Sequence, residues 1–134
     1  MLVQLVSIVA MAWAAWVLLN LAALILSACL LKPNAPCFNG LFIVMPDWIH
    51  KRLTPAEVAA VITHEEGHRH HRHVWENFAA VCLLSTPTPQ RRAQQEIEAD
   101  DYAVAAGHAR ALASALAKLG PGETNRIARL LMVS

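Results

Sequence analysis

The stretch that decides the fold of this chain is Thr63-His64-Glu65-Glu66-Gly67-His68-Arg69-His70-His71-Arg72. It contains H-E-x-x-H, a spacing that places two histidines one above the other on a single face of a helix, so that both imidazoles reach one metal ion. Glu65 is turned about 100° round the helix from His64, next to the open position of that metal. There it can take a proton from a water molecule. The pattern therefore indicates a hydrolytic zinc site.

The residues before the motif predict a helix that begins at Pro55. Thr54 is suited to cap this helix, Pro55 fits its first position, and Glu57 completes a capping box. Because a five-residue pattern also arises by chance, this context matters: the motif falls about two turns into a well-started helix. Apolar residues follow the start along the same helix, at Val58, Val61 and Ile62.

A third metal ligand is expected in a second helix, which should start near Thr88-Pro89 and end before Gly120-Pro121. Glu96 and Asp100 are four residues apart on one face of this helix, with small alanines beside them that allow a close approach to the first helix. We expect Glu96 to ligate zinc, and Asp100 to accept a hydrogen bond from a ligating histidine and set its orientation. The alternative ligands are Glu98 and Asp101, and the alternative to a metal site is a solvated acidic face.

Together these segments resemble the HtpX and CAAX prenyl protease family of membrane zinc metallopeptidases. The resemblance covers roughly residues 34–131, and it implies a zincin-like domain that is mainly α with a small β-sheet (α+β). It also implies a zinc-dependent endopeptidase that acts on membrane-associated or unfolded proteins. In this family His64, His68 and Glu96 would ligate zinc, Glu65 would be the general base and Asp100 would orient a histidine. The segments that carry the resemblance are Leu53–Glu57, His64–His68, Arg72–Asn77 and Glu96–Asp100.

Two further segments extend the resemblance. Residues 34–44 resemble the strand region that precedes the active helix, where an extended peptide substrate could add to the sheet edge. Residues 125–130 resemble a segment whose arginine lies near the active site, so Arg126, together with Tyr102, is a candidate for stabilising the oxyanion. The family usually has a histidine six residues before that arginine, and here Gly120 stands there. The chain is therefore either a compact active peptidase or a zinc-binding module that binds a partner without cutting.

The first 31 residues contain no charged residue and no histidine. A helix of 27 residues from Leu5 to Leu31 would span about 40 Å, more than the roughly 30 Å hydrocarbon core of a bilayer. We therefore expect a transmembrane helix over residues 1–32, followed by a metallopeptidase domain over residues 33–134. A cleaved signal peptide is disfavoured because no basic residue precedes the apolar core.

Positive charge follows this helix and does not precede it, at Lys32, Lys51 and Arg52. This distribution predicts a single-pass membrane protein with its catalytic part in the cytoplasm. The alternative is a lipoprotein, since Leu26-Ser27-Ala28-Cys29 resembles a cleavage box that would anchor Cys29 by lipid on the outer face. The other cysteines, Cys37 and Cys82, form no C-x-x-C pair; Cys37 could be an inhibitory fourth ligand but is favoured as a small strand residue.

The basic run that follows the motif is expected to be a solvated helix face. Its histidines, His70, His71 and His73, are not counted as ligands, and a net charge of only +1 argues against nucleic acid as a partner. Residues 78–84 should continue the active helix and join the domain core, although a surface dipping into lipid is the alternative. Ala103–Leu119 should be helical, and Glu123–Met132 should form a short closing helix.

Overall fold

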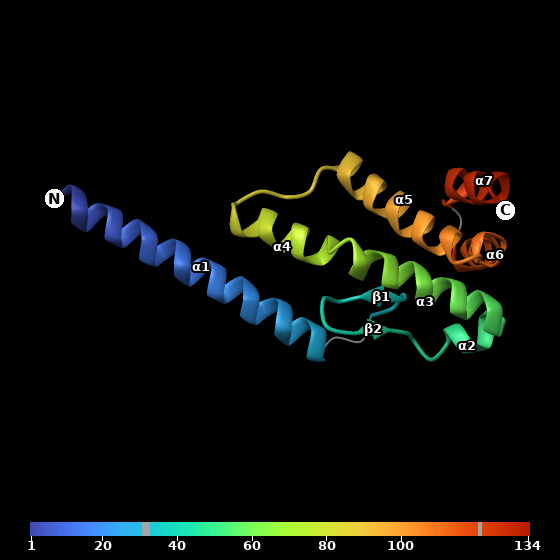
Figure 1. Cartoon of the computed structure of the whole chain (residues 1–134). Coiled ribbons are helices and arrows are strands. Elements are labelled where there is room, and N and C mark those ends of the chain that lie inside the picture. Colours follow the sequence, from blue (N-terminus) through green and yellow to red (C-terminus); the bar gives the residue numbers. More distant parts are fainter. Residues whose placement is uncertain (31–32, 121) are drawn as a thin grey trace.

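The computed structural model describes residues 1–30, 33–120 and 122–134. Within this part the fold is mainly α with a small sheet, as expected. The expected helix end at Leu31, the charge of Lys32 and the stop at Pro121 lie outside the described residues. The elements are α1 (Leu2–Leu30), β1 (Cys37–Phe38), β2 (Ile43–Val44), α2 (Ile49–Arg52), α3 (Pro55–His70), α4 (His73–Cys82), α5 (Pro89–Ala105), α6 (Ala109–Leu119) and α7 (Thr124–Met132) (Figure 1).

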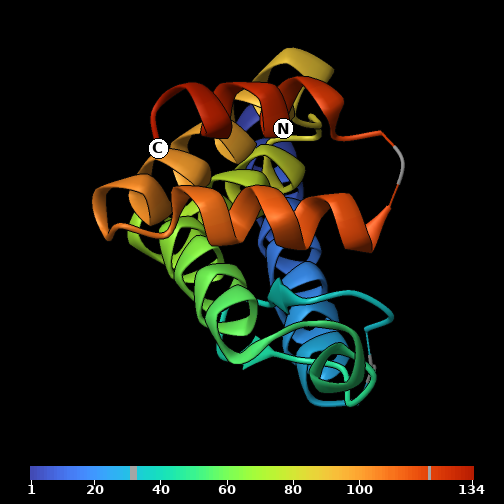
Figure 2. The same ribbon diagram turned by 90° about the vertical axis from the view of Figure 1, so that its right-hand side faces the viewer.

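Helix α3 is the centre of the domain. It packs against α5 and α6, and α7 lies beside α6 across the end of the molecule (Figure 2). The antiparallel pair β1–β2, with Cys37 opposite Val44 and Phe38 opposite Ile43, lies against α3. Burial of each large apolar side chain stabilises the fold by roughly 1.5–3 kcal/mol. The buried apolar side chains at the α2–α3–α6–α7 junction include Ile49, Leu53, Val61, Leu112, Leu116 and Leu130.

The predicted capping box at the start of α3 is confirmed. Thr54 accepts a hydrogen bond from the Glu57 backbone N–H, and the Glu57 carboxylate accepts one from the Thr54 N–H at 2.7 Å. Glu57 is buried and also accepts hydrogen bonds from Ser114 Oγ (2.6 Å) and Lys118 Nζ (2.7 Å) on α6. These hydrogen bonds, that of Lys118 above all, lower the pKa of Glu57 to about 2. An ion pair between Glu57 and Lys118 thus links the start of α3 to α6.

The expected close approach of α3 and α5 is also present. Ala99 and Ala103 are fully buried, and α3 faces them with Gly67. A Cβ atom added at Gly67 would lie 2.8 Å from the Ala99 Cα atom, a distance that real side chains do not tolerate. Small residues on both helices therefore permit the two backbones to come together at the motif.

Two helices are shorter than expected. The active helix does not continue to residue 84, because Arg72 adopts a left-handed conformation (φ 58°) that ends α3 and starts α4. The second expected helix divides into α5 and α6 at Gly107 (φ 83°), and the chain turns so that α6 can cover α3. Both breaks are local left-handed residues that reverse or redirect the chain.

The expectation that residues 78–84 join the core is wrong. Of these residues Cys82 alone is buried, while Leu83 and Leu84 are 71% and 78% exposed. Helix α4 lies along α1, away from the domain core (Figure 1). This short apolar stretch therefore has a partner other than the core.

Helix α1 is one long apolar helix with a mean hydropathy of 2.2 and none of its residues buried. By length and composition it can be a membrane anchor or a signal sequence. Its part from Trp13 onward contacts α4, and its N-terminal end extends beyond the rest of the chain (Figure 1). Two indole N–H groups join it to the end of α4: Trp13 Nε1 donates to Cys82 O (3.0 Å) and Trp16 Nε1 to Val81 O (3.2 Å).

Candidate metal centre

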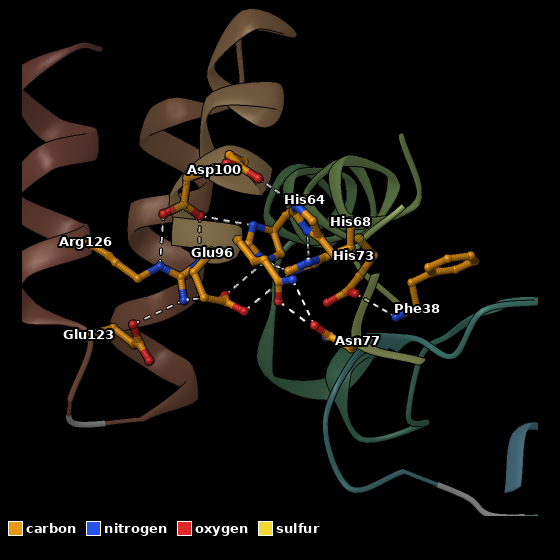
Figure 3. A network of polar contacts seen from close by, with 12 residues as sticks. Phe38, His64, His68, His73, Asn77, Glu96, Asp100, Glu123 and Arg126 are labelled. Atoms are coloured by element: carbon orange, nitrogen blue, oxygen red, sulfur yellow. Dashed lines mark hydrogen bonds and ion pairs between the residues drawn. The ribbon is translucent and has the colours of Figure 1, made fainter. Parts of the chain in front are cut away.

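Three side chains from two helices converge on one point. His64 and His68 come from α3 and Glu96 from α5 (Figure 3). The two Nε2 atoms are 3.2 Å apart, and each lies 3.5 Å from a Glu96 oxygen. Two ligand atoms placed at about 2.0–2.1 Å on a tetrahedral zinc are about 3.3–3.4 Å apart. The three separations are close to this value, with His64 facing Oε2 of Glu96 and His68 facing Oε1, and two imidazoles with one carboxylate are a donor set that zinc takes.

Asp100 lies behind His64, where it was expected. It is fully buried, and its Oδ1 is 3.0 Å from His64 Nδ1. The ring nitrogen is at ion-pair distance but is not aligned for a hydrogen bond, so His64 Nδ1 has no hydrogen-bond partner. A metal on Nε2 requires the proton to sit on Nδ1, facing the Asp100 carboxylate. Asp100 thus faces His64 at 3.0 Å, but the expected hydrogen bond between them is not formed, and the orienting role of Asp100 stays a prediction.

Arg126 reaches this cluster from α7. It binds Asp100 with two hydrogen bonds, Nε to Oδ2 at 2.9 Å and Nη2 to Oδ1 at 2.7 Å. Its Nη1 lies 3.0 Å from Glu96 Oε2 and 3.1 Å from Glu123 Oε2 (Figure 3). One guanidinium thus holds the carboxylate of the third metal ligand and the carboxylate behind His64. The ion pairs of Arg126 are with the carboxylates of Glu96, Asp100 and Glu123.

The charges of the cluster shift its ionisation. Burial alone would lower the pKa of His64, but Asp100 and Glu96 raise it to about 9. Burial, together with the charge of His64, lowers the pKa of His68 to about 4. Burial opposes ionisation of Asp100, yet His64 and Arg126 lower its pKa to about 2. At neutral pH His68 is therefore neutral and Asp100 ionised, whereas His64 is protonated and would have to release its Nε2 proton to bind a metal ion.

Glu65 lies beside the two histidines and is held by the sheet. Its Oε2 accepts a hydrogen bond from the Phe38 backbone N–H of β1 at 2.7 Å. Burial raises the pKa of Glu65, while the charge of His64 and the Phe38 N–H partly offset this effect. Glu65, both histidines and Glu96 line one hollow. Cys37 and Phe38 of β1 form part of the wall of this hollow. This carboxylate is placed to accept and return a proton.

One residue of the site was missed. The sequence favours a solvated face for His73, but this residue is 2% exposed, and its side chain lies next to that of His68 (Figure 3). Its Nδ1 is 2.8 Å from His68 Nδ1, and its Nε2 is 2.8 Å from Glu98 Oε2. In a continuous helix, five residues after His68, this side chain would point elsewhere. The left-handed turn at Arg72 brings it back to the site.

The direction of each hydrogen bond in the series His68–His73–Glu98 follows from metal binding by His68. With a metal on Nε2, His68 carries its proton on Nδ1 and donates it to His73 Nδ1. His73 then donates its Nε2 proton to Glu98. The carboxylate of Glu98 also accepts a hydrogen bond from Arg91 Nη1 at 2.9 Å. His73 and Glu98 would thus set the orientation of His68. Asp100 occupies the corresponding position beside His64.

A second group, His71 with His73 and Glu98, also brings three potential ligand atoms together. The 2.8 Å from His73 Nε2 to Glu98 Oε2 is a hydrogen-bond length and is shorter than the spacing of two zinc ligands. Arg91 already neutralises that carboxylate. We therefore interpret this group as support for His68.

The remaining candidates lie elsewhere. Glu98 supports His73, and Asp101 is 59% exposed and pairs with Arg129 at 2.6 Å, so neither replaces Glu96. Tyr102 does not lie at the metal group. The centroid of its ring lies 5.1 Å from that of His70, and Tyr102 lines a separate hollow with Glu66 and Arg69. It is not positioned to stabilise an oxyanion. Cys37 lines the metal hollow but is not among the ligand group.

The three converging side chains form a group that could hold a metal ion, and the comparison with known families points to a metallopeptidase. The model described as Peptidase family M48 matches residues 23–90, which contain the H-E-x-x-H helix and His73 and end before Glu96. This chain belongs to Peptidase family M48, the HtpX and Ste24-like metallopeptidases, and the resemblance seen in its sequence is confirmed. Comparisons with curated proteins and with solved structures gave no match.

Proposed function

We propose that this chain is a membrane-anchored, zinc-dependent endopeptidase that hydrolyses peptide bonds, with Glu65 as its general base. The observation that carries the proposal is the set of separations of 3.2–3.5 Å among His64, His68 and Glu96, with Glu65 held beside them. Family membership adds that the chemistry is that of a metallopeptidase and that the substrates are proteins.

The residues divide the work as follows. Zinc bound by the three ligands would polarise the scissile carbonyl and lower the pKa of a water molecule to about 7. Glu65 accepts the proton of the attacking water and delivers it to the leaving amine. Arg126 positions Glu96 and Asp100, and its positive charge near the ligands favours developing negative charge. Because its contacts are with Glu96 and Asp100, the main proposed role of Arg126 is to position these two carboxylates.

The substrate is proposed to bind as an extended strand. Strand β1 borders the hollow through Cys37 and Phe38, so a peptide lying beside it would pass over His64 and Glu65. Backbone pairing of this kind gives broad side-chain preference. Membrane-associated or unfolded proteins are the substrate class that fits such recognition.

The membrane anchor is proposed to be retained. The hydrogen bonds of Trp13 and Trp16 to α4, and that of Asn39 Nδ2 to Ala28 O (3.2 Å), make α1 part of the folded domain. Cleavage before Cys29, as in a lipoprotein, would remove the two indoles. These contacts favour an uncleaved helix over residues 1–32 and a metallopeptidase domain over residues 33–134. Lys51 and Arg52 follow the helix and favour the cytoplasmic side.

The second candidate is a zinc-binding module that binds a partner without cutting. It is favoured by one feature, Gly120 at the position of the family histidine. Both candidates predict a bound metal, so they separate on catalysis alone.

The test compares the full-length chain with Glu65→Gln, measuring zinc content and cleavage of casein by each. We expect equal zinc, and a loss of cleavage of about 10²–10⁴-fold in the variant. The matched control is Glu66→Gln, which makes the same change on an exposed neighbour and should leave cleavage intact. Zinc without cleavage by the unaltered chain would favour the binding module, and absence of zinc would contradict both.

A further inference from the structure

The last turns of α4 and the residues after it form an exposed apolar tip. We name residues 78–84, Phe78-Ala79-Ala80-Val81-Cys82-Leu83-Leu84, the α4 tip. We propose that the α4 tip inserts into one leaflet of the bilayer beside α1, so that the membrane surface lies at the level of the metal centre. The proposal rests on the membrane anchorage proposed above, and not on the catalytic activity.

The first argument is the surface of the tip. Leu83 and Leu84 are 71% and 78% exposed, and Leu84 adopts a left-handed conformation (φ 56°) that keeps the turn outside the domain. The tip carries no charge, and the polar segment Ser85–Thr88 follows it directly. Two adjacent leucines held out by a strained turn indicate an apolar environment around them.

The second argument is the hydrogen bonding of the tip. A helix ends with carbonyl groups that have no partner within the helix, and in hydrocarbon each such group costs several kcal/mol. Here the carbonyl of Cys82 accepts from Trp13, and that of Val81 accepts from Trp16 and from the Leu84 N–H. The carbonyls of Ala79 and Ala80 accept from the N–H groups of Leu83 and Ser85. Water would satisfy these groups without any indole.

Helix α1 shows the same property. Three of its polar side chains donate hydrogen bonds to backbone carbonyls of α1 itself, so these donors need no water. Ser7 Oγ donates to Val3 O (2.9 Å), Asn20 Nδ2 to Trp16 O (2.8 Å) and Ser27 Oγ to Leu24 O (2.8 Å). The α1–α4 pair is thus suited to a medium that offers no hydrogen bonds.

The third argument is the depth at which the tip would lie. The twenty residues from Leu2 to Leu21 span about 30 Å as a helix, the thickness of the hydrocarbon core. Helices α1 and α4 share a groove in which Asn20–Ser27 of α1 faces Val74–Val81 of α4. We place the membrane boundary near Asn77, at the level of this groove, so that the tip reaches about 10 Å below it, within one leaflet.

The residues at that boundary are of the expected kind. Trp75 is 41% exposed and packs edge-on against Phe78, as interfacial tryptophans do. Glu76, the neighbour of Trp75 in the sequence, forms two contacts of 2.6 Å with Arg91. Val74 and Asn77 line both the α1–α4 groove and the metal hollow. The metal hollow therefore opens at the headgroup level.

The test is a depth measurement with spin labels on the full-length chain in phosphatidylcholine vesicles. Single cysteines replace Leu83 in the tip, Leu18 on the exposed face of α1 and Leu131 on the exposed face of α7, after Cys29, Cys37 and Cys82 are changed to alanine. Oxygen, which concentrates in lipid, and a water-soluble nickel chelate report the surroundings of each label. We expect the label at residue 83 to match that at residue 18, with nickel accessibility several-fold below that at residue 131.

Other outcomes overturn the proposal in distinguishable ways. A water-like label at residue 83 with a lipid-like label at residue 18 would contradict the inserted tip alone. Water-like labels at both positions would also contradict the membrane anchor. A label at residue 83 that neither reagent reaches, with spin coupling between copies, would show a contact between two chains. Zinc content and the Glu65→Gln comparison are independent of all three results.

Discussion

At the scale of single residues, each proposed metal ligand is supported from behind by a second side chain. Asp100 faces His64, His73 contacts His68, and Arg126 holds Glu96. The H-E-x-x-H pattern and the four-residue spacing of Glu96 and Asp100 were readable in the sequence because both are local repeats of a helix. His73 was not, because its position depends on the left-handed turn at Arg72. A non-glycine residue in that conformation is set by surrounding packing and has no sequence signal.

We predict that His73→Phe weakens zinc binding by about 10–100-fold, the usual effect of losing the partner that orients a ligating histidine. The change removes both hydrogen bonds of His73 while keeping a ring in a buried site. Competition titration against a zinc chelator measures the effect. The control is His71→Phe, since His71 is an exposed neighbour whose ring stacks on His73 at 5.4 Å. An equal loss in the control would support a metal at His71, His73 and Glu98 instead.

At the scale of elements, α3 was predicted correctly at its start and wrongly at its end. Thr54, Pro55 and Glu57 act within one turn, so their pattern was sufficient. The break at Gly107 was hidden because alanine-rich residues continue on both sides of it, and the break at Arg72 was hidden because no glycine or proline marks it. Tertiary contacts decide there: α4 turns to α1, and α6 turns back to cover α3.

The link between α3 and α6 predicts a pH dependence of stability. The pKa of Glu57 falls from its ordinary value of 4.5 to about 2 in the folded chain. The unfolded chain therefore takes up this proton first, and the stabilisation is complete above pH 5 or so and is lost as the pH falls through 4.5 towards 2. The free energy of unfolding from urea titrations should fall over this range, and less steeply in Glu57→Gln. The same slope in Glu57→Gln as in the control Glu66→Gln would contradict the assignment.

At the scale of the whole molecule, α1, the α4 tip and the metal centre lie close together. Hydrogen bonds join α1 to the tip, and Val74 and Asn77 line both the α1–α4 groove and the metal hollow. The long apolar helix α1 was plain in the sequence from its uniform apolarity. Its contact with α4 was not, because seven apolar residues are too short to distinguish core from lipid. A catalytic hollow at the headgroup level would give a small peptidase access to chains leaving the membrane.

The most direct test of the metal centre is zinc analysis with zinc-edge X-ray absorption on the purified full-length chain. We predict about one zinc per chain, with nitrogen and oxygen neighbours at about 2.0–2.2 Å, two imidazoles among them and no sulfur. The zinc should be lost in His64→Ala and retained in Glu65→Gln. Absence of stoichiometric zinc, or a sulfur neighbour at about 2.3 Å that would place Cys37 on the metal, would contradict the account.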